Sequence, residues 1–168
     1  FMQAEARISA DSPRVAIIVP AYGLAHLLGE ALDSVLAQTE SDWECIVIDD
    51  GAPDDVAGAV APYLADGRIR FLATDNGGVS AARNRAIAST SAPYITLLDA
   101  DDRLRPDYLA QLVQVIAADE AVRLVTCNAL MFGALPQERL CFDAPQPPGT
   151  LAAVLDRSFG VYIGSTFR

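Results

Sequence analysis

The sequence contains the stretch Tyr94-Ile95-Thr96-Leu97-Leu98-Asp99-Ala100-Asp101-Asp102. Its first five residues form a short, mostly apolar run that is typical of a strand buried in a sheet. Three carboxylates follow the run directly. Residues two apart in an extended chain project to the same side, so Asp99 and Asp101 are expected to converge on one point, with Asp102 pointing elsewhere.

Two converging carboxylates repel each other unless a cation lies between them. Oxygen ligands of this kind suit Mg²⁺ or Mn²⁺, and Mg²⁺ is often held by one or two carboxylates together with substrate phosphates. The alternative interpretation is an acidic turn that caps the helix after it. Taken alone, the stretch favours neither interpretation.

Strand-like runs alternate with helix-like segments along the rest of the chain. The other expected strands are residues 15–19, stopped by Pro20, and residues 44–48, 68–73 and 122–129. Apolar residues recur at helical spacing in four segments between them, which are residues 24–36, 56–64, 79–87 and 109–116, the last with Pro106 expected in its first turn. This alternation predicts an α/β fold, a mostly parallel sheet with helices on both faces.

The pattern breaks towards the end of the chain. Four prolines fall between residues 134 and 150, which predicts a loop or a short hairpin. Residues 151–156 are expected to form a helix and residues 161–167 a strand. No internal repeat or low-complexity segment is present, and the length of 168 residues suits one domain.

Ligands of such sheets bind beyond the carboxyl ends of the strands. The segments expected there are Pro20-Ala21-Tyr22, Asp49-Asp50-Gly51, Asp75-Asn76-Gly77-Gly78 and residues 99–102. The Asp50 carboxylate can accept hydrogen bonds from a base or a ribose, although Asp-Gly is also an ordinary turn signal. The glycines before the third helix can present backbone N–H groups to a diphosphate, or serve only as a helix entry.

Arg83 occupies a core-facing position in the apolar stripe of its expected helix. A buried guanidinium needs an anionic partner, and a phosphate or an acidic strand end would serve. The alternative is that the side chain extends past the core to the surface.

Composition excludes several kinds of chemistry. The net charge of −10 argues against a nucleic-acid partner, and the absence of lysine excludes Schiff-base, P-loop and kinase-type lysine chemistry. The three cysteines, Cys45, Cys127 and Cys141, show no metal-binding spacing and are expected to be small buried residues in a reducing compartment. The single histidine, His26, receives no role. No apolar run approaches the roughly 20 residues of a membrane-spanning helix.

The ordered set of motifs resembles family 2 glycosyltransferases with the GT-A, Rossmann-like fold. The resemblance covers about residues 14 to 130, through residues 17–22, 34–39, 43–51, 76–84 and 94–102 and Pro106. Two segments depart from the family pattern. Ala21-Tyr22-Gly23 stands where Thr-Tyr-Asn is usual, and Gly51-Ala52-Pro53 lacks the serine that usually follows Asp-Gly.

The resemblance implies transfer of a sugar from a nucleoside-diphosphate sugar, commonly UDP-linked, to a hydroxyl of an acceptor, with inversion and with Mn²⁺ or Mg²⁺. The acceptor would be a glycan, a lipid-linked molecule or a protein. Asp50 would accept a hydrogen bond from the base, Arg83 would lie near the diphosphate, and Asp99 would contact the ribose or a metal-bound water. The nucleotide-sugar-binding residues implied are Pro20, Ala21, Tyr22, Asp50, Gly77, Arg83, Asp99 and Ala100, and the metal ligands implied are Asp101 and Asp99.

The same resemblance implies a division of the chain. Residues 1–13 are expected to be a tail, in which Phe1 ahead of Met2 is interpreted as a remnant of expression, and residues 14–168 the donor-binding domain. The catalytic base is expected beyond Arg168, so this chain alone is expected to be inactive. The implied setting is bacterial polysaccharide assembly in the cytoplasm, either free or peripheral at the inner face of the membrane.

Three other functions share some of these features. A phosphatase with an aspartyl nucleophile needs Thr or Val where Arg103 stands, and a lysine. A nucleotidyltransferase usually has a Gly-rich basic loop after its first strand, where this chain has residues 20–23. A module that binds a sugar nucleotide without turnover remains open.

Overall fold

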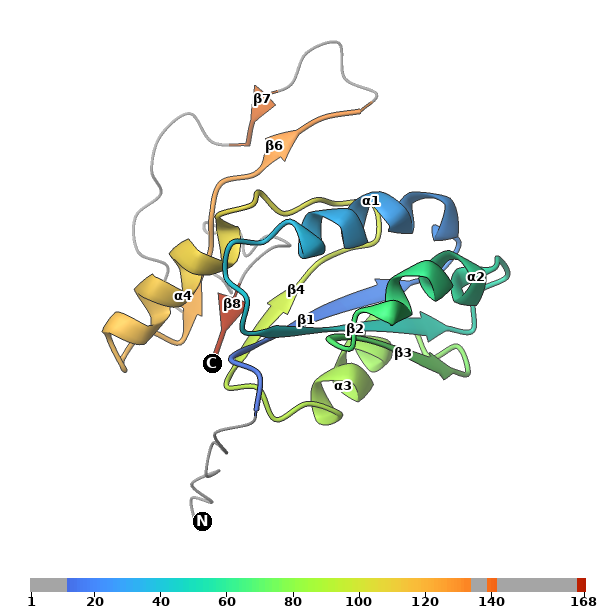
Figure 1. Cartoon of the computed structure of the whole chain (residues 1–168), viewed down its shortest axis with the longest axis horizontal. Coiled ribbons are helices and arrows are strands. Elements are labelled where there is room, and N and C mark those ends of the chain that lie inside the picture. Colours follow the sequence, from blue (N-terminus) through green and yellow to red (C-terminus); the bar gives the residue numbers. More distant parts are fainter. Residues whose placement is uncertain (1–11, 134–138, 142–165) are drawn as a thin grey trace, which may run out of the picture.

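The computed structural model describes residues 12–133, 139–141 and 166–168, and these form a central sheet covered by helices (Figure 1). The sheet has the strand order β3-β2-β1-β4-β8-β5. Its strands are β1 (Val15–Ala21), β2 (Trp43–Asp50), β3 (Ile69–Thr74), β4 (Tyr94–Leu97), β5 (Leu124–Val125) and β8 (Thr166–Phe167). The first four are parallel, and β8 is antiparallel to both of its neighbours. The predicted mostly parallel sheet is therefore confirmed.

Helices cover both faces of this sheet, as predicted. They are α1 (Ala25–Leu36), α2 (Val56–Val60), the 3₁₀ helix η1 (Ala61–Ala65), α3 (Val79–Ala88) and α4 (Tyr108–Ala118). Successive residues of β1 point to opposite faces, so Val15 and Ile17 belong to the core under α1, α2 and α4, whereas Ile18 packs against α3 (Figure 1). This double burial explains why β1 is apolar at nearly every position.

Polar side chains in the core connect α1 to the segment that leads into α4. The buried Gln38 donates to the Ser34 carbonyl over 3.0 Å and to the Arg105 carbonyl over 2.8 Å, and it accepts from the Leu109 amide over 3.1 Å. The Ser34 hydroxyl accepts from the Leu104 amide over 3.1 Å. The chain that follows the acidic stretch is thus fixed against α1.

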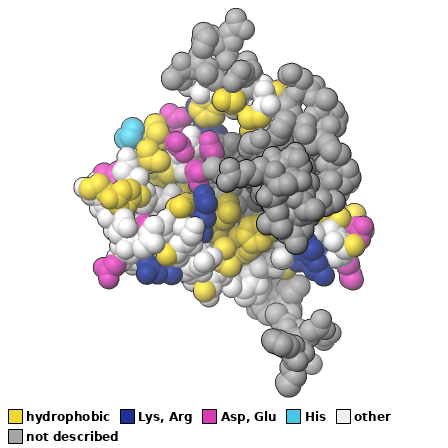
Figure 2. Space-filling view, turned by 180° about the vertical axis from the view of Figure 1, so that it is seen from behind, with side chains coloured by type: hydrophobic (Ala, Val, Ile, Leu, Met, Phe, Trp, Pro, Cys, Tyr) yellow, Lys and Arg dark blue, Asp and Glu magenta, His cyan; other side chains and the backbone are white. Residues whose placement is uncertain are grey.

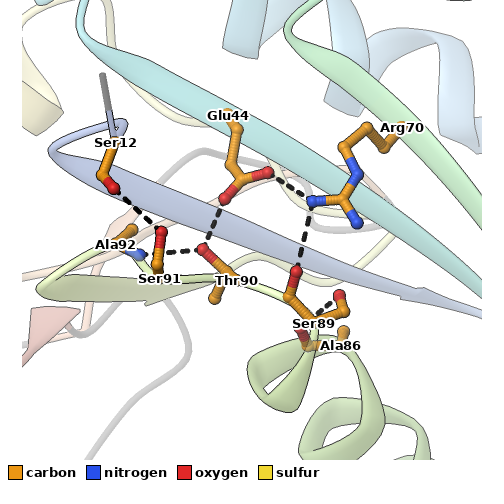
Figure 3. Close-up of polar contacts among 8 residues, drawn as sticks. All are labelled: Ser12, Glu44, Arg70, Ala86, Ser89, Thr90, Ser91 and Ala92. Atoms are coloured by element: carbon orange, nitrogen blue, oxygen red, sulfur yellow. Dashed lines mark hydrogen bonds and ion pairs between the residues drawn. The ribbon is translucent and has the colours of Figure 1, made fainter. Parts of the chain in front are cut away.

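A second polar group lies at the amino-terminal end of the sheet (Figure 3). The buried Glu44 accepts from Arg70 Nη1 over 2.7 Å and from the Thr90 hydroxyl. The same Nη1 also donates to the carbonyl of Ser89, which ends α3. A cation is favourable at the C-terminus of a helix, so Arg70 both neutralises Glu44 and fixes the end of α3 against β2 and β3.

Pro20 does not stop β1, which continues to Ala21. Ile18 turns its carbonyl towards β4 and accepts from the Leu98 amide over 3.0 Å. Pro20, two residues further on, faces the same way but lies past the last residue of β4. The missing N–H of proline therefore costs no ladder hydrogen bond to β4, and the strand can contain it.

Other predicted bounds were also wrong. The fifth strand covers only Leu124–Val125, and the second helical segment divides into α2 and η1 because Pro62 interrupts it. Pro106 precedes α4 rather than lying in its first turn. The pairing of β6 (Leu130–Met131) with β7 (Arg139–Leu140) agrees with a short hairpin. The helix expected over residues 151–156 lies outside the described residues, and so do residues 1–11 of the expected tail. Of the strand expected over residues 161–167, only β8 is described.

Cys45 is buried as predicted, and burial raises the pKa of its thiol. Cys127 was wrongly predicted as buried. It is exposed because β5 ends at Val125, before the chain reaches it. In the part of the chain that the structure describes, every helix is too short or too polar to cross a membrane.

Candidate functional site

Three carboxylates gather just beyond the carboxyl end of β4. Oxygen atoms of Asp99, Asp101 and Asp102 lie within 4.8 Å of one another. The convergence of Asp99 with Asp101 follows the prediction, but Asp102 does not point elsewhere. The Asp102 amide donates to the Asp99 carbonyl over 3.0 Å, so the chain turns here instead of staying extended and brings the third carboxylate into the cluster.

The three negative charges affect one another. The pKa of Asp102 is raised, first by burial and then by the charges of Asp101 and Asp99. Like charges at this distance favour a protonated or cation-bound state. Figure 2, which views the side opposite to that of Figure 1, shows acidic side chains gathered beside an arginine on one part of this face.

Arg83 pairs with this cluster from α3. Its Nη2 lies 2.6 Å from Oδ1 of Asp99, and the two side chains are 22% and 26% exposed. The Arg83 Nε is buried and has no hydrogen-bond partner among the described residues. The sequence allowed two anionic partners for Arg83, a phosphate or an acidic strand end. In the structure its partner is Asp99, at the acidic strand end. Ala82 and Ala86 form the buried stripe of α3, whereas Val79, predicted to join it, is half exposed.

The end of β2 forms the second part of the site. Asp50 is only 4% exposed, and its Oδ1 accepts from the Gly77 amide over 2.8 Å. Asp49 accepts from the Ala52 amide over 2.7 Å, which is the turn chemistry expected for Asp-Gly. Gly51 has a φ of +67°, and a Cβ there would lie 2.8 Å from the Asn76 backbone nitrogen. Glycine is therefore required for the close approach of the two loops.

The other predicted site residues differ in their surroundings. Ala21 and Ala100 are buried with the core, Pro20 is half buried, Gly77 is exposed, and Tyr22 is 54% exposed. The ring of Tyr22 is therefore accessible to solvent, whereas the side chain of Ala100 packs inward.

Two nearby residues were missed by the sequence analysis. Asp54 accepts from the Gly23 and Ala25 amides over 3.0 and 2.7 Å and so caps the start of α1; these bonds, that of Ala25 first, lower its pKa. Arg85 lines an open depression at the end of β3 with Ala73, Thr74 and Asp75. Nothing in the spacing of either residue marks it. Asp54 bonds amides 31 and 29 residues earlier, and Arg85 bonds a backbone carbonyl, which carries no sequence signal.

Comparison with known proteins identifies the class. The profile described as Glycosyl transferase family 2 matches residues 16–133, so the chain belongs to that family. This range contains β1 except its first residue, β2 to β4, and the carboxylates that follow them.

Curated relatives agree with this assignment. The chain is 45% identical over 118 residues to the uncharacterized glycosyltransferase EpsJ of Bacillus subtilis, covering 69% of this chain and 34% of the relative. It is 34% identical over 110 residues to the glycosyltransferase GlyA of Streptococcus pneumoniae, covering 64% and 16%. It is 32% identical over 114 residues to the chondroitin synthase of Pasteurella multocida, covering 67% and 12%. The chain thus spans about a third or less of these relatives.

Solved structures support the GT-A fold. The mannosyltransferase PcManGT from Pyrobaculum calidifontis, in complex with GDP-Man and Mn²⁺, superposes with a TM-score of 0.62 at 28% identity, covering 70% of this chain and 36% of that one. TarS 1-349 of S. aureus, in complex with UDP, superposes with a TM-score of 0.59 at 23% identity, covering 62% and 32%.

Proposed function

We propose that residues 14–168 contain the donor-binding part of a glycosyltransferase that transfers a sugar from a nucleoside-diphosphate sugar to an acceptor hydroxyl. The observation that carries the proposal is the cluster of Asp99, Asp101 and Asp102 beside Arg83, at the carboxyl end of β4. It lies at the end of the sheet where α/β proteins of this kind bind their ligands.

The donor set fits a divalent cation. Three carboxylates within 4.8 Å offer hard oxygen ligands. Burial, and then the charges of Asp101 and Asp99, raise the pKa of Asp102, and a bound cation would offset both effects. We propose that Asp101 and Asp99 hold Mn²⁺ or Mg²⁺. The bound ion would stabilise the negative charge of the leaving diphosphate.

The other residues would position the nucleotide. Asp50, oriented by the Gly77 amide, would accept a hydrogen bond from an N–H of the base. Arg83 would lie beside the diphosphate, because the guanidinium that pairs with Asp99 has further N–H groups to donate. Pro20, Tyr22 and the backbone of the buried Ala21, at the end of β1, would line the nucleotide site. Because solved neighbours carry UDP in one case and GDP-Man in another, the choice of uridine rests on the family resemblance.

The proposed reaction is one in-line displacement. The acceptor oxygen forms a bond to the anomeric carbon as the bond from that carbon to the diphosphate oxygen breaks, which inverts the configuration. A base takes the proton of the acceptor hydroxyl. We propose a glycan acceptor, in line with the chondroitin synthase among the relatives. We also propose that the protein acts in a bacterial cytoplasm, either free or at the inner face of the membrane.

A thermal-shift titration tests donor binding. UDP with Mn²⁺ should raise the Tm, and Asp101→Asn should abolish the metal-dependent part of the shift. Glu120→Gln removes an exposed carboxylate beyond α4 and serves as the matched control. If no nucleoside diphosphate raises the Tm of the wild type with Mn²⁺, the proposal is wrong. Release of UDP from a UDP-sugar by this chain would exclude the binding-module alternative and would contradict the expectation that the chain alone is inactive.

A further inference from the structure

Arg85 is the second arginine of α3, and it contacts the loop that precedes the helix. Its Nη1 donates to the Asp75 carbonyl over 3.0 Å. The guanidinium also lies against Gly77, because a Cβ placed on Gly77 would be 3.5 and 3.6 Å from its two terminal nitrogens. Arg85 therefore contacts both ends of the short segment formed by residues 75–77.

This segment is packed against the end of β2. The Thr74 hydroxyl donates to the Asp49 carbonyl over 3.2 Å, and the Gly77 amide donates to Asp50 over 2.8 Å. Between these two bonds, the Asn76 backbone approaches Gly51 so closely that a Cβ there would be 2.8 Å away. The orientation of the Asp50 carboxylate thus depends on where the segment lies.

Glycine has more backbone freedom than any other residue, and Gly77 and Gly78 follow each other here. Such a segment loses much conformational entropy when it is held in one position. A planar guanidinium that bonds the Asp75 carbonyl and covers Gly77 restricts it from the outer side. Arg85 is exposed, so it can do this without being part of the core.

We infer that Arg85 is a positioning residue: it holds residues 75–77 against β2 and, through the Gly77 amide, fixes Asp50 for the base of the nucleotide. The functional part of this inference rests on the proposed donor binding. Arg85 lies outside the carboxylate cluster, so its effect should fall on the nucleotide and spare the metal. A preorganised carboxylate binds a ligand more tightly because less conformational entropy is lost on binding.

The first test needs no ligand. Amide hydrogen exchange of Gly77, measured by NMR, should become about tenfold faster in Arg85→Ala, as expected for the loss of one hydrogen bond from a charged group. Arg85→Lys should recover part of the protection, since an ammonium can reach the Asp75 carbonyl but cannot cover Gly77. Arg123→Ala makes the same charge change next to β5, at the opposite edge of the sheet from β3, and is the control.

The second test measures binding by calorimetry. Arg85→Ala should weaken UDP binding in the presence of Mn²⁺ by about tenfold and change the affinity for Mn²⁺ alone by less than about twofold. Gly77 exchange that is unchanged relative to Arg123→Ala would overturn the inference. So would an equal loss of UDP and Mn²⁺ affinity, which indicates general destabilisation. A wild type that binds no nucleoside diphosphate would refute the proposed function, and Gly77 exchange would then decide the role of Arg85.

Discussion

Arg83 Nη2 lies 2.6 Å from Oδ1 of Asp99, and this ion pair joins α3 to the carboxylate cluster that follows β4. It connects a helix on one face of the sheet to the loop after β4, and it offsets part of a charge that would otherwise repel Asp101 and Asp102. The pair is partly shielded from solvent, so each partner depends on the other.

Removing the cation of this pair should lower the free energy of unfolding more than removing the anion. Arg83→Met leaves three carboxylates uncompensated and should lower the free energy of unfolding by about 2 kcal/mol. Asp99→Asn also breaks the pair but relieves repulsion within the cluster, so its cost should stay below about 1 kcal/mol. Urea denaturation without divalent metal measures both values. Equal losses in the two variants would show that repulsion in the cluster is negligible.

The hydrogen bonds of Glu44 predict an effect on stability at the end of the sheet opposite to the carboxylate cluster. Glu44→Ala removes a buried acceptor from Arg70 and Thr90 and should cost about 2 kcal/mol. Glu44→Gln keeps the shape and an acceptor oxygen for Arg70, so its cost should be below about 1 kcal/mol. Urea denaturation of both variants checks the difference, and a Gln variant as unstable as the Ala variant would contradict it.

Gly51 and Gly23 form a matched pair of substitutions. Both have positive φ, +67° and +73°, so alanine strains the backbone at either position by about 1 kcal/mol. A Cβ at Gly23 meets nothing within 4 Å, whereas at Gly51 it meets the Asn76 backbone. Gly51→Ala should therefore cost at least about 1 kcal/mol more than Gly23→Ala in urea denaturation. Similar costs would show that the β2 and β3 loops separate easily.

The Asp66–Arg68 pair predicts a pH dependence. Side-chain hydrogen bonds from Arg68, 2.7 and 3.0 Å long, and then its backbone amide hold the pKa of Asp66 at about 2. A carboxyl whose pKa is lowered in the folded state stabilises the fold above its unfolded pKa, and this contribution disappears as pH falls towards 2.

Asp66→Asn should therefore be less stable than the wild type at pH 5 to 7, by less than about 1 kcal/mol because solvent screens the pair. The difference should vanish between about pH 4 and pH 2. Arg68 lies 3.8 Å above the ring of Trp43, the single tryptophan, whose fluorescence can follow unfolding. A difference that persists at pH 2, or one that 1 M salt does not reduce, would contradict the assignment.

The periodicity of the chain predicted the strands β1 to β4 and the helices between them, because each buries one or both faces and its apolar spacing records that burial. The prediction failed where the bounds of a strand depend on its neighbours in the sheet. Pro20 is the clearest case, since its effect depends on how far β4 extends alongside β1. The short β5 is another, since an apolar run does not specify how many residues find a partner strand.

The sequence by itself determined which residues follow each strand, and in a parallel sheet this places Asp50 and Asp99 at the same edge. The tertiary structure alone decided the contacts among them: the turn that brings Asp102 into the cluster, the choice of Asp99 as partner of Arg83, and the bonds of Asp50 and Arg85 to the loop after β3. The physical reason is range. Burial patterns are recorded in neighbouring residues, whereas a hydrogen bond between loops depends on the positions of segments that only the packed sheet brings together.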